Sequence, residues 1–344
     1  MGKPDLLMKV FFSNPYVFAD IFNFWLHDGA QLIKPENLKE ASGNLVNLTE
    51  KNVDELLDQI IASADAEEAE LPNIEVNERI RDVLMHLVCM EDGESVYAIL
   101  GIEGQTHVDY ALAARALLYD ALQLNKQVEA IQDQHRARGE AGNSTGEFLW
   151  RFFKTDRLVP VITVVVYLGS SEWDGPRTLH DMFETKNQTL LRESTDYRLK
   201  LIEPKRMHKE EIEKFQTSMR EVMLYMKASG NKQELLNLAR EGKLRKVDRV
   251  AAHLINAVSH SKLKIEKGKE TIDMCKAIEG IREDARIEGV AQGIEQGIEQ
   301  GIEKTQKEVS LRMAAEGMAV SLIARLINVQ EETVEGWLLA AARS

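Results

Sequence analysis

The sequence predicts a mixed α/β core over residues 1–203, followed by an all-helical C-terminal region. Two strand-like segments, residues 81–90 and 95–103, flank an Asp-Gly pair that is typical of hairpin turns. The β-branched run within residues 158–168 is typical of a strand buried on both faces of a sheet. After residue 204 the strand patterns disappear, and apolar residues recur at helical spacing.

The N-terminal part of this core begins with two predicted helices. Apolar residues recur at helical spacing over residues 5–26, and the Ser-Asn-Pro sequence at 13–15 separates them. Residues 44–49 alternate and predict a short strand. Residues 51–80 hold nine acidic and two basic residues, for a net charge of −7. We interpret them as an acidic insertion in a solvated loop or a weak helix.

The segment beyond the hairpin is predicted to be a long helix and a loop. Residues 109–135 carry apolar side chains on one helical face, and residues 136–147 are polar and Gly-rich, as loops are. The next region, residues 204–288, reads as a series of helices. The individual segments predicted there are residues 209–228, 232–241 and 247–260.

A short repeat and a helical pair end the chain. Residues 289–304 read GVAQ-GIEQ-GIEQ-GIEK, which predicts a self-associating helix or a semi-flexible linker over residues 289–309. Residues 310–344 predict a C-terminal helical pair with the spacing of a helix-turn-helix. Its second helix opens with Glu331 and Glu332, which phosphates would repel, so an oligomerising or capping pair is favoured over a DNA-reading one.

The net charge of −13 over 344 residues argues against a passive nucleic-acid coat, because phosphate binding requires basic residues. Residues 200–270, however, hold 17 basic and 10 acidic residues. Arg245 and Lys246 lie in that region and are either part of a solvated helix face or a phosphate-contacting patch. The two cysteines, Cys89 and Cys275, are far apart in the sequence and cannot form a disulfide framework. No apolar run is long enough for a membrane span. We therefore expect a cytoplasmic protein.

The candidate functional side chains lie at the end of the predicted hairpin that is farthest from its turn. If its strands pair through the Asp-Gly turn, Asp82 and Glu103 lie equally far from the turn, and Gln105 faces the same side as Glu103. Apposed carboxylates repel one another unless a proton or a cation lies between them. Oxygen ligands of this kind suit Mg²⁺, Mn²⁺ or Ca²⁺. By themselves, these residues could equally be surface carboxylates flanking a hairpin.

A family resemblance adds context to these residues. The chain resembles the Rpn family of recombination-promoting nucleases, also described as YhgA-like transposases, within the PD-(D/E)XK nuclease superfamily. The resemblance extends over most of residues 1–305. It is carried by residues 81–84 (RDVL), 97–105 (YAILGIEGQ), 109–111 (DYA), 118–122 (LYDAL), 160–163 (PVIT), 173–180 (WDGPRTLH), 196–198 (DYR) and 273–275 (DMC).

The resemblance implies a restriction-endonuclease-like core with a metal-dependent DNA endonuclease site. Asp82 and Glu103 then correspond to metal ligands, and Gln105 stands where many superfamily members have a lysine. Gln105 can orient water or a phosphate oxygen, but it carries no charge. Asp5 is the leading candidate for a third metal-site acid, ahead of Glu78 and Asp20. Gly104 departs from the asparagine usual in relatives, with a loss of local rigidity as the expected effect.

Arg115 and Tyr119 lie one turn apart on the helix after the site. They could bind phosphate and stack on a base, or simply pack that helix on the sheet. The leading functional hypothesis is a DNA endonuclease that promotes recombination or accompanies mobile elements. The alternative is a catalytically inactive DNA-binding or assembly protein that retains the nuclease fold, and a transposase proper is a third hypothesis. We expect DNA as partner and a homo-oligomer through the C-terminal helices.

Overall fold

The computed structural model describes residues 2–40, 83–88, 96–261, 263, 265 and 269–342. Several sequence predictions fall on other residues: the strand at 44–49, the acidic insertion, the hairpin turn, Glu78, Asp82 and Cys89 lie outside the described residues. The chain divides into two compact units, Met1–Ile278 and Glu279–Ser344.

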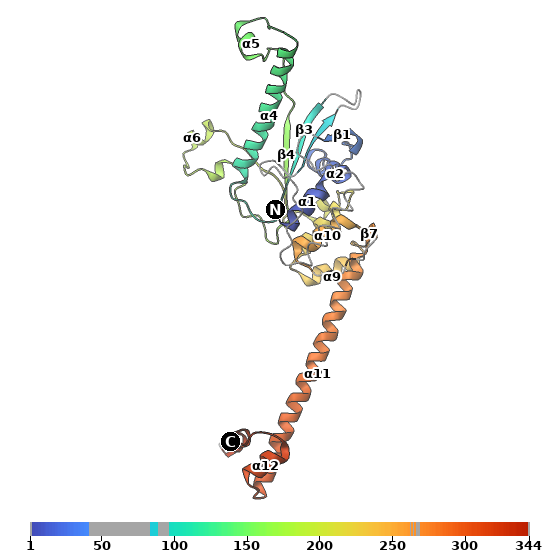
Figure 1. Cartoon of the computed structure of the whole chain (residues 1–344), viewed down its shortest axis with the longest axis vertical. Helices are drawn as coiled ribbons and strands as arrows, with labels where there is room; N and C mark the ends of the chain where they lie inside the picture. Colours follow the sequence, from blue (N-terminus) through green and yellow to red (C-terminus); the bar gives the residue numbers. More distant parts are fainter. Residues whose placement is uncertain are drawn as a thin grey trace. The chain divides into compact units, whose positions relative to one another are not determined.

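A mixed five-stranded sheet forms the centre of the first unit, in the spatial order β1-β2-β3-β4-β5 (Figure 1). The first three strands are antiparallel neighbours, whereas β4 runs parallel to both β3 and β5. The strand bounds are β1 Leu38–Glu40, β2 Val83–Val88, β3 Val96–Gln105, β4 Val161–Tyr167 and β5 Lys200–Ile202. The predicted strands of the hairpin and the predicted buried strand are therefore confirmed.

The parallel pairing of β3 and β4 requires a crossover connection, which α4 (Leu112–Ala137) and α5 (Thr145–Trp150) provide. Residues of β4 alternate between two separate hydrophobic cores. Val164 and Val166 belong to the larger core, whereas Val165 and Tyr167 pack with residues of α4. Both faces of β4 are thus covered, which explains its continuous run of β-branched residues.

The larger core joins the N-terminal helices to the region after residue 204. α1 (Lys3–Ser13) packs against α10 (Arg249–Ser259), and α2 (Pro15–His27) packs against α8 (Met219–Ala228). The predicted break between α1 and α2 is confirmed, and the side chain of Asn14 accepts the Tyr16 N–H at 2.9 Å to cap α2. The remaining elements of this unit are η1 Pro35–Asn37, η3 His180–Met182, α6 Gln188–Glu193, α7 Lys209–Ile212, α9 Lys232–Arg240, β6 Val247–Asp248 and β7 Thr271–Ile272.

The single helix predicted over residues 209–228 is wrong, because α7 and α8 form there instead. The chain between them is held by Asp20 of α2, whose carboxylate accepts the backbone N–H groups of Gln216 and Thr217 at 2.9 and 2.8 Å. These donors are therefore committed to a side chain rather than to a continuous helix. The helices predicted at residues 232–241 and 247–260 are present as α9 and α10, and the short β6–β7 ribbon was not predicted.

In the second unit, the end of α11 (Met274–Ala315) packs with α12 (Val320–Ile327) and α13 (Glu331–Ala342). Ile323, Ala324 and Val334 form the buried centre of this small core. The predicted C-terminal helical pair is therefore present. The glycine repeat is helical within α11, and Val290, Ile294, Ile298 and Ile302 are all exposed along it.

Candidate active site

Glu103 and Gln105 lie on the face of β3 that α4 covers. Their strand neighbours in register are Val165 and Tyr167, which both belong to the core beneath α4. Glu103 is buried, and the Gln105 side-chain amide donates to its carboxylate over 3.1 Å from Nε2 to Oε1. The predicted common orientation of these two side chains is thus observed. A buried carboxylate is costly unless polar or cationic groups surround it, so its surroundings carry information.

Arg115 provides the cationic neighbour. Its guanidinium Nη2 lies 3.7 Å from Glu103 Oε1 and donates to the Tyr119 hydroxyl at 3.1 Å, while Nη1 is paired with Asp109. The side chain remains 45% exposed, so one side of the guanidinium still faces solvent. The structure therefore brings Glu103, Gln105, Arg115 and Tyr119 together, although Asp109 was not foreseen as the second carboxylate on Arg115.

Electrostatics fix Arg115 as a cation. Burial lowers its pKa, but the Tyr119 hydrogen bond and the charges of Tyr119, Asp109 and Glu103 together raise it above the ordinary value of a guanidinium. Arg115 therefore holds its positive charge at any physiological pH. A fixed cation beside a buried carboxylate, with exposed N–H donors, suits a site that receives an anionic group such as a phosphate.

A buried hydrogen-bond network holds α4 against the sheet next to this site. Asp120 of α4 accepts the Thr163 hydroxyl of β4 at 2.7 Å and the Tyr197 hydroxyl at 2.6 Å. Sequence reasoning missed Asp120, yet a signal existed: it is an acid on the helical face that also carries Leu112 and Ala116, both buried. The network fixes the position of α4, and hence of Arg115, relative to β3.

Of the other acids predicted for this site, the structure describes Asp5 and Asp20. Asp82 immediately precedes β2 in the sequence but lies outside the described residues, and the described Val83 pairs with Ile102, the neighbour of Glu103. Asp5 is on α1, which packs against the opposite face of the sheet, and its carboxylate accepts the Gly2 N–H at 3.0 Å. Asp20 is fully buried and ties α2 to Thr217, so it has a structural role.

The basic residues predicted near the C-terminal side of the first unit are separate from this group. Arg245 and Lys246 are exposed between α9 and β6, and nearby Lys243 pairs with Glu213 at 2.6 Å. Arg245 and Lys246 thus lie between α9 and β6, whereas Glu103 and Arg115 belong to β3 and α4.

The donor set at β3 can be compared with what a divalent cation requires. The described residues contain no group of three or more His, Cys, Asp or Glu side chains that could hold a metal ion. They do supply the Glu103 carboxylate, a hard oxygen donor of the type Mg²⁺ prefers, and beside it the Gln105 side chain, which faces Glu103 through Nε2 and also carries an amide oxygen. The chemistry of the residues present therefore fits a divalent cation, with further oxygen ligands required to complete the site.

The fold and this site define a mixed α/β protein with a polar, partly cationic site at the end of β3. The family described as "Putative transposase, YhgA-like" matches residues 32–246, which is more than half of the chain. The chain belongs to that family, and the resemblance seen in the sequence is confirmed. No curated protein matches the chain. No solved structure matches it either. Among the residues described, none of the helices is both long and apolar enough to span a bilayer.

Proposed function

We propose that the protein is a divalent-metal-dependent DNA endonuclease whose active site lies at the end of β3. The observation that supports this most strongly is the buried Glu103, whose Oε1 accepts a hydrogen bond from Gln105 and lies 3.7 Å from the Arg115 guanidinium. The Arg115 side chain is 45% exposed, so its guanidinium is accessible from solvent beside this carboxylate. An accessible guanidinium of this kind suits the binding of an anionic substrate.

The residues have distinct roles in this proposal. Glu103 and Asp82, the residue before β2, would hold the cation. Asp5, the third acid predicted from the sequence, lies on α1 against the opposite face of the sheet, so the proposed site does not include it. A bound Mg²⁺ supplies an activated water and neutralises charge on a phosphoryl oxygen. Gln105 can orient the attacking water through its amide, since it has both donor and acceptor atoms. Arg115 contacts the phosphate, and Tyr119 supports the guanidinium through its hydroxyl.

The family's description as a transposase and its implied interaction with DNA agree with this chemistry. Strand transfer would need the same cation and carboxylates, followed by attack of a DNA hydroxyl in place of water. We favour hydrolysis because Gln105 lies beside Glu103, where it can position a water molecule. A role in promoting recombination or in mobile elements is the biological setting we propose.

The test is cleavage of supercoiled plasmid by the purified full chain with Mg²⁺, Mn²⁺, Ca²⁺ or EDTA. Glu103→Gln keeps the shape of the side chain and removes its charge, so we expect cleavage to fall by about 10²–10³-fold, the typical cost of losing one electrostatic group. Asp82→Ala should abolish cleavage. Glu172→Gln is the matched control, because its side chain is 61% exposed and pairs only at the surface with Arg206.

Two outcomes would contradict the proposal. Mg²⁺-dependent nicking that persists in Asp82→Ala and Glu103→Gln would place the active site elsewhere. Metal-independent DNA binding by the parent protein, without cleavage of any substrate, would favour the inactive DNA-binding or assembly protein. In either case circular dichroism of each variant must match the parent, so that loss of activity reports chemistry and not unfolding.

A further inference from the structure

The loop between α4 and β4 forms a separate structural feature, which we call the α5 tip (residues 138–157) (Figure 1). It contains the short helix α5 and lies at the C-terminal end of α4. Three consecutive large apolar residues on it are exposed to solvent: Phe148 at 52%, Leu149 at 67% and Trp150 at 72%. Large apolar residues that are exposed side by side, unlike single scattered ones, are candidates for an interaction site.

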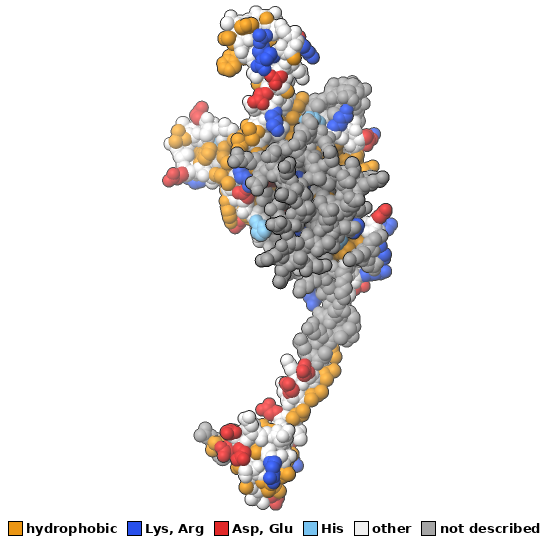
Figure 2. All heavy atoms as spheres, in the orientation of Figure 1, with side chains coloured by type: hydrophobic (Ala, Val, Ile, Leu, Met, Phe, Trp, Pro, Cys, Tyr) orange, Lys and Arg blue, Asp and Glu red, His pale blue; other side chains and the backbone are white. Residues whose placement is uncertain are grey.

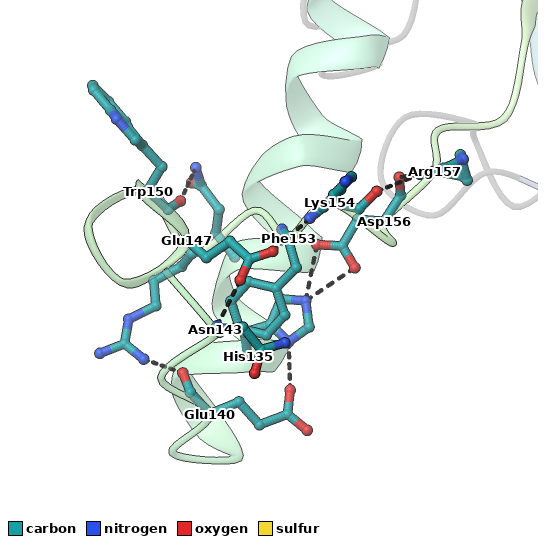
Figure 3. Close-up of polar contacts among 11 residues, drawn as sticks. His135, Glu140, Asn143, Glu147, Trp150, Phe153, Lys154, Asp156 and Arg157 are labelled. Atoms are coloured by element: carbon teal, nitrogen blue, oxygen red, sulfur yellow. Dashed lines mark hydrogen bonds and ion pairs between the residues drawn. The ribbon is translucent and has the colours of Figure 1, made fainter. Parts of the chain in front are cut away.

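The α5 tip is held rigidly by a polar network beneath the exposed residues (Figure 3). His135 of α4 lies between two carboxylates, pairing with Glu140 through Nδ1 and with Asp156 through Nε2 at 3.0 Å. Its ring stacks on Phe153 with 3.8 Å between ring centroids. Trp150 is anchored only by its backbone, since its carbonyl accepts from Gln132 Nε2 at 2.8 Å while the indole points away from the network. The exposed rings therefore sit on a preorganised base.

The loop backbone is fixed as well. Glu147 accepts the N–H groups of Asn143 at 2.6 Å and Lys154 at 2.9 Å, which closes the loop around α5. Gly142 has a φ of +73°, and a Cβ there would come within 2.5 Å of the Glu147 Cβ. Such a loop keeps its shape when the exposed residues are left without a partner, so little ordering entropy is lost on binding.

The acidic and basic side chains of the α5 tip differ in where they point. Its carboxylates are directed inward: Glu140 and Asp156 face His135, and Glu147 faces backbone N–H groups. The basic side chains are not neutralised in the same way. Arg151 donates to a backbone carbonyl, and its Cζ lies 4.8 Å from the centroid of the Phe148 ring. Arg157 donates to backbone carbonyls. Arg138 and Lys154 are exposed. Apolar and basic surfaces consequently lie side by side at the top of Figure 2.

Exposed aromatic rings between basic side chains match the chemistry of a single DNA strand, in which bases stack on the rings and phosphates meet the cations. The position of the tip agrees with this. Twenty residues of α4 separate Arg115 from His135, a rise of about 30 Å. That is roughly nine base pairs of B-DNA, so one DNA molecule could contact both ends of α4.

We propose that the α5 tip binds unpaired bases of single-stranded DNA by stacking on Trp150 and Phe148, with Arg138, Arg151 and Lys154 contacting the backbone. The link to cleavage rests on the proposed function: the preferred substrate would carry an unpaired segment about nine base pairs from the cut. Binding itself is independent of the β3 site and is measured without metal.

The experiment is fluorescence anisotropy with the full chain in EDTA, using a labelled oligothymidine of about 20 nucleotides and a duplex of the same length. Trp150→Ala should weaken single-strand binding by about 5- to 150-fold and duplex binding much less, given the usual strength of base stacking. Trp150→Phe should retain most of the affinity, whereas Trp150→Leu, which keeps the apolar surface, should not. Leu190→Ala is the control, because Leu190 is 58% exposed on α6, outside the tip.

Other results overturn the proposal. Unchanged single-strand affinity in Trp150→Ala, or equal loss for both DNAs, excludes base stacking at the tip. Trp150-dependent binding to phosphatidylcholine vesicles containing about a quarter phosphatidylserine, without an effect on DNA, identifies a membrane surface instead. A Trp150-dependent change in oligomeric state, again without an effect on DNA, identifies a second copy of the chain. Loss of single-strand binding in Trp150→Ala supports the proposed DNA-binding role of the α5 tip. That conclusion holds even if Glu103→Gln still cuts DNA, a result that would contradict only the proposed active site.

Discussion

Asp20 provides the sharpest test of how the first unit is held together. Its carboxylate accepts the Gln216 N–H at 2.9 Å, the Thr217 N–H at 2.8 Å and the Thr217 hydroxyl at 2.7 Å, and Asp20 itself is buried. Asp20→Asn keeps the shape but removes the charge, so each bond weakens by roughly 1 kcal/mol. The free energy of unfolding should therefore fall by about 3 kcal/mol, or by more in Asp20→Ala, which leaves three donors without an acceptor.

Urea unfolding followed by circular dichroism measures this change. A slope of about 3 kcal/mol per molar urea turns the loss into a midpoint lower by roughly 1 M. Glu172→Gln is the control, because Glu172 pairs with Arg206 at the surface and its loss should cost about 1 kcal/mol or less. If Asp20→Asn leaves the midpoint unchanged but abolishes Mg²⁺-dependent cleavage, Asp20 belongs to the active site and the structural argument is refuted.

Three further predictions concern separate parts of the chain. The logarithm of the affinity for duplex DNA falls linearly with the logarithm of the salt concentration, and replacing Arg245 and Lys246 with glutamine should make that slope shallower by nearly two. An unchanged slope would exclude phosphate contacts at these residues. Tyr197→Phe removes the donor to Asp120 and should lower the unfolding free energy by about 1–2 kcal/mol, measured in urea. The hydrogen bond to Glu140 is the main cause that raises the pKa of His135 in the folded protein. The protonated ring therefore stabilises the α5 tip fully at pH values below the pKa of His135 in the unfolded chain. This stabilisation is lost as the pH rises through the raised pKa of the folded protein. Hydrogen exchange in the tip, corrected for intrinsic rates, should then increase with pH, but not in His135→Gln.

The strands around the site were predictable because their signals are local. The β-branched run of β4 and the apolar stretch of β3 before Glu103 specify strands within a few residues, and the Glu103–Gln105 orientation follows from the period of two. The spacing of Arg115 and Tyr119 on one helical turn was equally readable.

The features that were missed depend on long-range partners. Asp20 meets Thr217 across 197 residues of sequence, and Asp120 meets Tyr197 across 77, so no window of sequence shows that these acids are hydrogen-bonded in the core. Residues 136–147 were predicted to be a polar loop, and α5, which begins at Thr145, was not foreseen. The pairing of His135 with Asp156 spans 21 residues, so no local pattern reveals it. The contact between Arg115 and Glu103 likewise depends on where α4 returns to the sheet.

The packing of α1 against α10 has a consequence for synthesis of the chain. Residues Leu6 to Phe12 of α1 are all buried, and α10 begins only at Arg249. At typical elongation rates of about 5–20 residues per second, roughly 10–50 s pass between the emergence of the two helices from the ribosome. A strongly apolar nascent helix therefore waits without its partner, which makes the growing chain a candidate for chaperone binding and makes any product truncated before α10 prone to aggregate.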